Sequence, residues 1–124
     1  FTENNSFGNA DTDATTRVGT SIFTPSATQN ILAVGDVVTA SGTVHVLTAT
    51  GGAITLTSNP MIANGTSGQI LILTLPNGAA NNVVFTAAAG NILLGAATRT
   101  LSAQDTLTLL YDGADWIELA FANN

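Results

Sequence analysis

Residues 105–121 read DTLTLLYDGADWIELAF, two runs of alternating residues on either side of an Asp-Gly turn. Successive side chains of a strand point to opposite faces, so each run presents one apolar face. The residues predicted to share a face are Leu107, Leu109 and Tyr111 in the first run and Ile117, Leu119 and Phe121 in the second, opposite Trp116, Glu118 and Ala120. Asp and Gly favour tight turns, and the segment therefore predicts a β-hairpin over a core.

Similar segments recur along the rest of the chain. Short β-branched and Leu-rich runs follow one another at a spacing of about 8–12 residues, which is typical of a sandwich or barrel. No stretch shows the apolar stripe and caps of a helix. We therefore predict an all-β fold, a jelly-roll-like antiparallel β-sandwich or barrel over residues 18–124. The predicted strands are 18–24, 31–39, 43–49, 53–58, 69–75, 82–87, 91–94, 98–101, 105–111 and 115–121.

The composition excludes several classes of function. Charged side chains make up 8% of the 124 residues, with two Arg, no Lys and a net charge of −6. Nucleic acids and anionic membranes are bound through several cationic side chains, so we expect neither as a partner. There is no Cys, which excludes disulfides and thiolate chemistry. The chain begins at Phe1 instead of Met, from which we expect processing or trimming.

The N-terminal residues 1–17 are polar and show no strand or helix period. Two isolated aromatic residues, Phe1 and Phe7, lie within them. We predict an extended arm that orders on a neighbouring protein, with both Phe side chains as anchors. A frayed tail is the alternative.

Segment 69–75, QILILTL, is apolar on both of its faces. A strand of a two-layer sandwich has only one inner face, so something else must cover the other. A subunit interface would do so; the alternative is a loop or the N-terminal segment of the same chain. Segment 82–85 has the same character. The residues predicted for self-assembly are Ile70, Leu71, Ile72, Leu73, Leu75 and Val84.

The sequence offers no candidate for chemistry. His45, the one histidine, alternates with Val44 and Val46, and we expect a structural or interface residue. If copies of it met at a symmetry axis, that contact would respond to pH. Asp112 and Asp115 are interpreted as solvated turn residues and not as an acid–base pair. We therefore predict no catalytic, cofactor-binding or metal-binding residues, no cofactor and no enzymatic activity.

The C-terminal half carries a recognisable pattern over residues 64–121. A Gly-Gln before an apolar strand is followed by an Asn-x-Leu-x-Gly motif, a Thr-Leu pair and the hairpin. The matching positions are Gly68-Gln69, Asn91, Leu93, Gly95, Thr100-Leu101, Asp105-Thr106-Leu107, Leu109, Tyr111-Asp112-Gly113 and Trp116. This pattern resembles tailed-bacteriophage virion surface proteins, among them tail-fibre segments and head decoration proteins.

The resemblance implies jelly-roll-like domains that trimerise about a threefold axis and attach to a capsid or baseplate. A compact chain with an arm fits best a capsid decoration (cement) protein, a homotrimer on the phage head that binds the major capsid protein or another virion protein. Binding only the assembled shell would stabilise it by mass action. The alternatives are a receptor-binding or lectin-like fibre domain and a self-polymerising extracellular filament subunit, whose arm adds a strand to the next sheet. All three place the protein on a virion surface or outside the cell.

Overall fold

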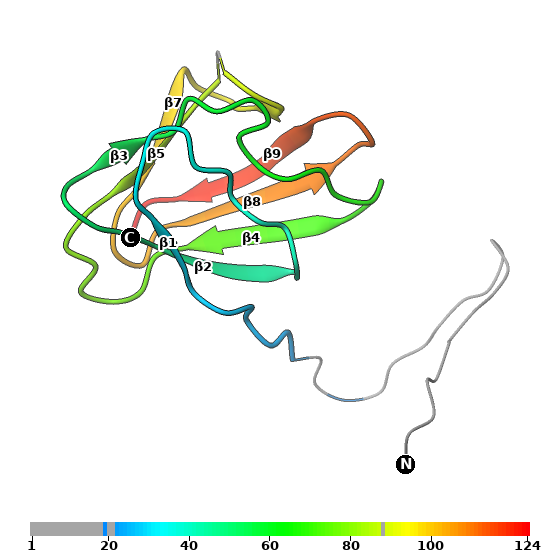
Figure 1. The fold of residues 1–124 in the computed structure, drawn as a ribbon. Coiled ribbons are helices and arrows are strands. Elements are labelled where there is room, and N and C mark those ends of the chain that lie inside the picture. Colours follow the sequence, from blue (N-terminus) through cyan, green and yellow to red (C-terminus); the bar gives the residue numbers. More distant parts are fainter. Residues whose placement is uncertain (1–18, 20–21, 88) are drawn as a thin grey trace, which may run out of the picture.

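The computed structural model describes residues 19, 22–87 and 89–124, and all regular structure in that part is β (Figure 1). The predicted arm with Phe1 and Phe7 lies outside the described residues. The strands are β1 (Gln29–Ile31), β2 (Val44–Ala49), β3 (Ile54–Thr55), β4 (Ile70–Thr74), β5 (Val83–Thr86), β6 (Ile92–Leu93), β7 (Thr98–Leu101), β8 (Thr106–Tyr111) and β9 (Trp116–Ala122).

These strands form two sheets that share one core. The large sheet has the strand order β1-β2-β4-β8-β9-β6, and the small sheet has the order β3-β5-β7. In Figure 1 the small sheet lies across one end of the curled large sheet. The predicted all-β sandwich is therefore confirmed. The strand predicted over residues 18–24 is not formed at its described residues 22–24.

The direction of the strands differs from the prediction. From β2 to β8 the chain changes sheet at every step, because β2, β4, β6 and β8 belong to the large sheet and the strands between them to the small one. Such crossovers allow parallel pairing. The pairs β1–β2, β2–β4, β3–β5 and β6–β9 are parallel, whereas β4–β8, β5–β7 and β8–β9 are antiparallel. The predicted antiparallel pairing is therefore present in three of these seven strand pairs.

The strand predicted over residues 31–39 ends at its first residue, because the chain turns there. The Asp36 carboxylate accepts hydrogen bonds from the backbone amides of Leu32, at 2.7 Å, and Ala33, at 3.1 Å. Asp side chains commonly close turns in this way, at the expense of strand pairing.

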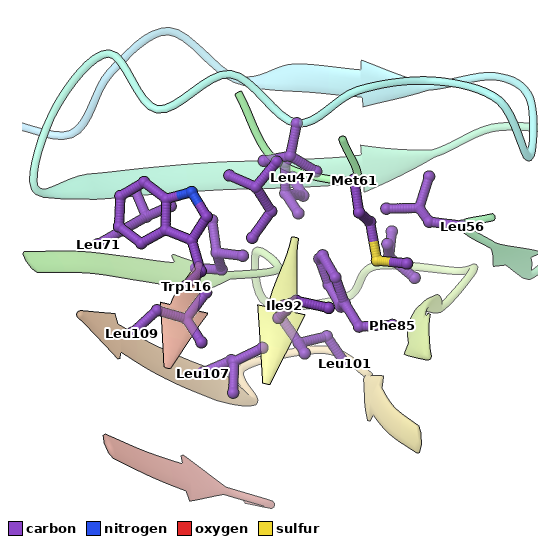
Figure 2. Close-up of a cluster of buried hydrophobic side chains, with 14 of the residues drawn as sticks. Leu47, Leu56, Met61, Leu71, Phe85, Ile92, Leu101, Leu107, Leu109 and Trp116 are labelled. Atoms are coloured by element: carbon purple, nitrogen blue, oxygen red, sulfur yellow. The ribbon is translucent and has the colours of Figure 1, made fainter. Parts of the chain in front are cut away.

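Each strand turns one face into the core, as the alternation predicts for β8. Leu71 and Leu73 of β4 are fully buried, and so are Leu107 and Leu109 of β8. Figure 2 shows how side chains from both sheets meet there. The largest fully buried side chains are Trp116, Phe85, Ile31, Leu47, Leu56, Met61, Ile62, Leu71, Leu73, Leu75, Ile92 and Leu101.

In β9 a bulge reverses the predicted alternation. Thr108 and Leu109 of β8 are adjacent, but their partners Ala120 and Glu118 are separated by the extra residue Leu119. Because one residue is inserted, Trp116 and Phe121 both face inward despite their odd separation. Leu119 is 54% exposed. The prediction that it shares a core-facing side with Ile117 and Phe121 is therefore wrong.

Trp116 is completely buried and has a defined partner for its one polar atom. Its Nε1–H donates to the carbonyl of Ala63 at 3.1 Å, and its ring lies 5.0 Å from the ring of Tyr111. Gly65 lies directly against the indole, so that a Cβ there would be 2.8 Å from the ring. Only glycine at this position leaves room for the tryptophan.

The assignment of a buried face and an outward face to β4 can be tested directly by mutation. Replacing fully buried Leu73 by Ala should lower the free energy of unfolding by about 2–5 kcal/mol, because a core cavity is left. The matched change Ile72→Ala, on the outward face, should cost less than about 1.5 kcal/mol in the isolated protomer. Urea unfolding of dilute protein measures both values. Equal costs would contradict the assignment of the two faces.

Candidate functional site

The outward face of the large sheet is the most distinctive surface of the described domain. Pairing registers place its side chains in three rows across β2, β4, β8, β9 and β6. The rows are Leu93–Ile117–Leu110–Ile70, Ala120–Thr108–Ile72–Val44 and Ala122–Thr106–Thr74–Val46. We call these twelve residues the outer face. It holds only aliphatic side chains and threonines, and none of its residues is charged.

The edges of the outer face differ in character. At the β1 edge, Asn30 exchanges hydrogen bonds with Thr48 and Thr50 at 2.9–3.2 Å. At the β6–β9 edge, Leu93 is 51% exposed, and the bulged Leu119 is exposed to a similar degree. Contiguous apolar surface of this kind marks interaction sites more often than free surface. The surface is therefore apolar at its β6–β9 edge and polar at its β1 edge.

The predicted self-assembly residues divide among three locations. Ile70 and Ile72 lie on the outer face and are half-buried. Leu71, Leu73 and Leu75 belong to the core of the protomer, with at most 1% of each exposed, so they are not free to contact a partner. Val84 lies on the outward side of the small sheet, away from Ile70 and Ile72. Only two of the six residues therefore lie together on one free surface.

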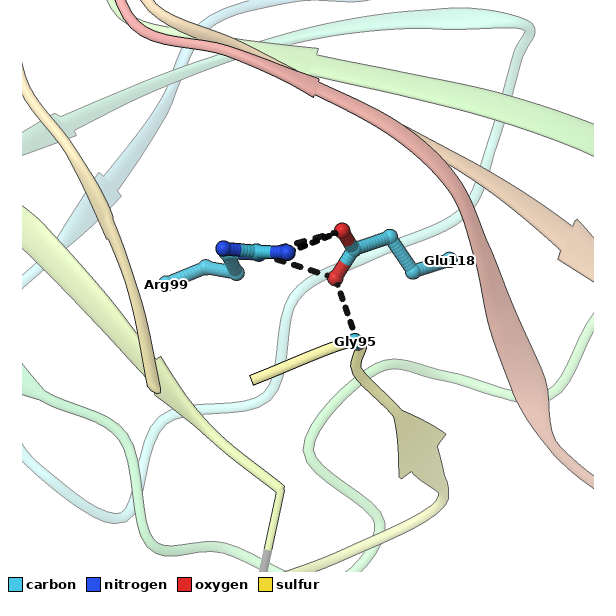
Figure 3. Close-up of polar contacts among 3 residues, drawn as sticks. All are labelled: Gly95, Arg99 and Glu118. Atoms are coloured by element: carbon cyan, nitrogen blue, oxygen red, sulfur yellow. Dashed lines mark hydrogen bonds and ion pairs between the residues drawn. The ribbon is translucent and has the colours of Figure 1, made fainter. Parts of the chain in front are cut away.

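An ion pair joins the two sheets on the inner side of β9. Arg99 of β7 donates from Nη2 to Glu118 Oε1 at 2.6 Å and from Nε to both carboxylate oxygens at 2.9–3.1 Å (Figure 3). The amide of Gly95 donates to the same carboxylate at 2.9 Å. The guanidinium also lies 4.9 Å from the centre of the Phe121 ring. This arrangement fastens the small sheet to β9 through a bidentate pair.

The ion pair shifts the pKa values of both Glu118 and Arg99. Hydrogen bonds from Arg99 lower the pKa of Glu118 below its ordinary 4.5, against an opposing effect of burial. The hydrogen bond to Glu118 raises the pKa of Arg99. The sequence alone did not predict the pair, because plain alternation gave no sign that Glu118 meets a residue 19 positions away. The bulge and the second sheet bring them together.

His45 lies on the inner side of β2 and is 1% exposed. The expectation of a structural histidine fits this position. Copies of His45 do not meet at a symmetry axis of an assembly of this protomer, because the ring does not reach the surface. Desolvation by burial lowers the pKa of His45.

Asp112 and Asp115 form the β8–β9 turn, as predicted. Asp112 Oδ1 accepts from the amides of Ala114 and Asp115, at 2.8 Å each, and these bonds lower the pKa of Asp112. Within the described residues no group of three or more His, Cys, Asp or Glu side chains is placed to hold a metal ion. The described part of the chain also contains no helix that could span a membrane.

The Arg99–Glu118 pair predicts a specific pH dependence. Because the pKa of Glu118 is lowered in the folded state, its contribution to stability is present above pH 4.5 and is lost as pH falls through the lowered value. Glu118→Gln should therefore lose less stability than the wild type between neutral pH and about pH 3, measured by urea unfolding.

Arg99→Gln and the double variant complete a cycle that isolates the pair. In the Arg99→Gln background, Glu118→Gln should change the pH dependence much less, since the partner that lowers the pKa of Glu118 is gone. An equal effect of Glu118→Gln in both backgrounds would contradict the pairing.

Comparison with known proteins places this sandwich in a family. The family model of the phage depolymerase C-terminal beta sandwich domain matches residues 21–117, which span almost all of the described strands. No curated protein and no solved structure matches the chain. The resemblance to tailed-phage virion proteins is thereby confirmed, with a virion-associated, extracellular setting of the tail-fibre type, and placement on the phage head is not supported. The chain belongs to the family of phage depolymerase C-terminal β-sandwich domains.

Proposed function

We propose that this chain is a non-catalytic assembly domain of a phage tail-fibre-type protein, which joins copies of itself into a homotrimer through the outer face. The observation that carries the proposal is the composition of that face. Its twelve residues on five paired strands include no charged side chain. Family membership supports a structural role in the virion.

The energetics favour covering this face. Burying an unpaired charge is strongly unfavourable, whereas aliphatic side chains gain roughly 25 cal/mol for each Å² removed from water. Ile117 and Leu110 form the central part of the most apolar row, between Leu93 and Ile70. The threonines of the other rows add hydroxyls that can hydrogen-bond across an interface or through water. A partner surface of the same composition satisfies both kinds of contact.

A trimer is the assembly that the resemblance to phage virion proteins implies. In it, the same patch of each protomer would face the common axis, so that one small surface is used three times. The other expected partner is a further virion protein, for which the N-terminal residues with Phe1 and Phe7 stay the proposed contact.

A single charge placed on the outer face should prevent assembly. Ile72→Lys should weaken self-association by roughly a hundredfold or more, because the ammonium would be buried without a partner. Val84→Lys, on the outward side of the small sheet, is the matched control and should assemble like the wild type. Sedimentation velocity over a concentration series measures the oligomeric state. A monomeric wild type, or a trimeric Ile72→Lys variant, would contradict the proposal.

A capsid decoration protein is the narrower alternative, based on the compact size of the chain and its polar N-terminal residues. Purified protein would then raise the temperature at which bare capsids open, since it would bind the shell and not free subunits. No shift at saturating protein would reject this function. The family match favours the tail-fibre type instead.

The receptor-binding alternative is weakened by the position of the aromatic residues. Sugars are commonly bound by exposed aromatic rings, but Trp116, Tyr111 and Phe85 lie in the core. Among the described aromatic side chains, Phe23 is the exposed one. A filament subunit built by strand addition stays open as a further alternative. For that case, a truncation starting at residue 17 would be monomeric while the intact chain polymerises.

A further inference from the structure

Among the described residues that lead into β1, one is anchored on the sandwich. Segment 22–28 forms no strand, and among its seven described residues only Ser26 is half-buried, the others being exposed. The Ser26 amide donates to the carbonyl of Val44 at 2.9 Å. The Ser26 hydroxyl lies 3.3 Å from the same carbonyl and is hydrogen-bonded to Nδ1 of His45.

The contacts on the Nε2 side of the imidazole determine which ring nitrogen of His45 carries the hydrogen. Gln29 Nε2 donates to the carbonyl of Val37 at 2.7 Å, and Gln29 Oε1 accepts from the amide of Thr39 at 2.9 Å. The orientation of the Gln29 amide is therefore determined, with its oxygen 3.0 Å from His45 Nε2. Since an oxygen acceptor faces Nε2, that nitrogen carries the hydrogen. Nδ1 of the neutral ring is then the acceptor, and the Ser26 hydroxyl donates to it.

No charged group of the described chain balances a protonated His45. The elements packed around the ring contribute Gln29 from β1, Thr39 from the following connection, Leu73 from β4 and Ser26, and none of these side chains titrates. The carboxylate of Asp36, which lies between Gln29 and Thr39 in the sequence, is bonded to backbone amides of its own turn. The ion pair that the described residues form is the distant Arg99–Glu118.

We propose that His45 and Ser26 form a pH-sensitive latch, a contact that fastens segment 22–28 to the sandwich and opens when the imidazole is protonated. The sandwich itself stays folded in both states. The latch thereby controls how firmly segment 22–28 is held against the domain, whether or not the domain self-associates.

Protonation affects the two sides of the ring unequally. The Gln29 contact is unchanged, because Nε2 is a donor in both states. At Nδ1 the hydrogen bond must reverse, and the Ser26 hydroxyl must then turn its hydrogen to the Val44 carbonyl, which already accepts from the Ser26 amide. A buried cation without a counter-charge also requires water. Displacing Ser26, the anchor of an otherwise exposed segment, admits that water with little loss of other contacts.

The test is amide hydrogen exchange by NMR on the full 124-residue chain at low concentration. Between about pH 7.5 and about pH 4.5, the protection factor of the Ser26 amide, corrected for the intrinsic rate, should fall at least about tenfold. The Leu73 amide in the core should keep its protection. Ring ¹⁵N shifts of His45 should show a hydrogen on Nε2 at the higher pH and titrate with the same midpoint.

Three results would overturn the latch: a ring that titrates without loss of Ser26 protection, a ring that stays neutral over the whole range, or loss of Leu73 protection in the same step. His45→Gln should make Ser26 protection independent of pH, and retained pH dependence would also overturn it. Ser26→Ala should leave the residue-26 amide poorly protected at both pH values. Ser41→Ala, an exposed serine of the same connection as Thr39, is the matched control and should behave like the wild type.

Discussion

The complete burial of Trp116 is the constraint on which the rest of the structure depends. An indole of that size fits only against Gly65, and its N–H must find an acceptor, which the Ala63 carbonyl provides. Its inward position sets the phase of β9, so that Glu118 also faces inward. A carboxylate there needs a partner, and Arg99 of the small sheet provides it.

The inward position of Trp116 also determines which side chains of β9 face the solvent. Because Trp116 faces inward, Ile117 faces outward and continues the apolar row between Leu93 and Leu110. The bulge at Leu119 then returns Phe121 to the inner side beneath Arg99. The core, the ion pair and the uncharged outer face are therefore three consequences of the register of one strand.

The local pattern of the sequence predicted β2 to β9 but neither the bounds of β1 nor how the strands are arranged. β8 follows the prediction, with Leu107, Leu109 and Tyr111 inward, because its period of two is uninterrupted. Pairing direction is decided by connections that cross between sheets, which no local pattern reveals. The bulge was missed for a related reason, since one inserted residue leaves the sequence looking regular.

The candidate site was predicted in part. The two-sided character of segment 69–75 indicated that a second apolar face needs cover, and Ile70 and Ile72 do lie outward. The sequence did not predict which face of segment 69–75 packs in the core, nor that Val84 lies on the other sheet. Both depend on packing partners far away in the sequence. The polar contacts of His45 were not predictable either, because Ser26 lies 19 positions away and reaches it only through the fold.

The alternation of the chain between layers has a consequence for how the domain forms. No continuous stretch of the sequence contains one complete sheet without strands of the other, since the strands of the two sheets alternate along the chain from β2 to β8. Neither sheet can therefore be completed before the other, and both must form together around the shared core. A topology dominated by such distant pairings folds slowly compared with a chain of local hairpins. A truncation at any point between β3 and β7 accordingly leaves both sheets incomplete.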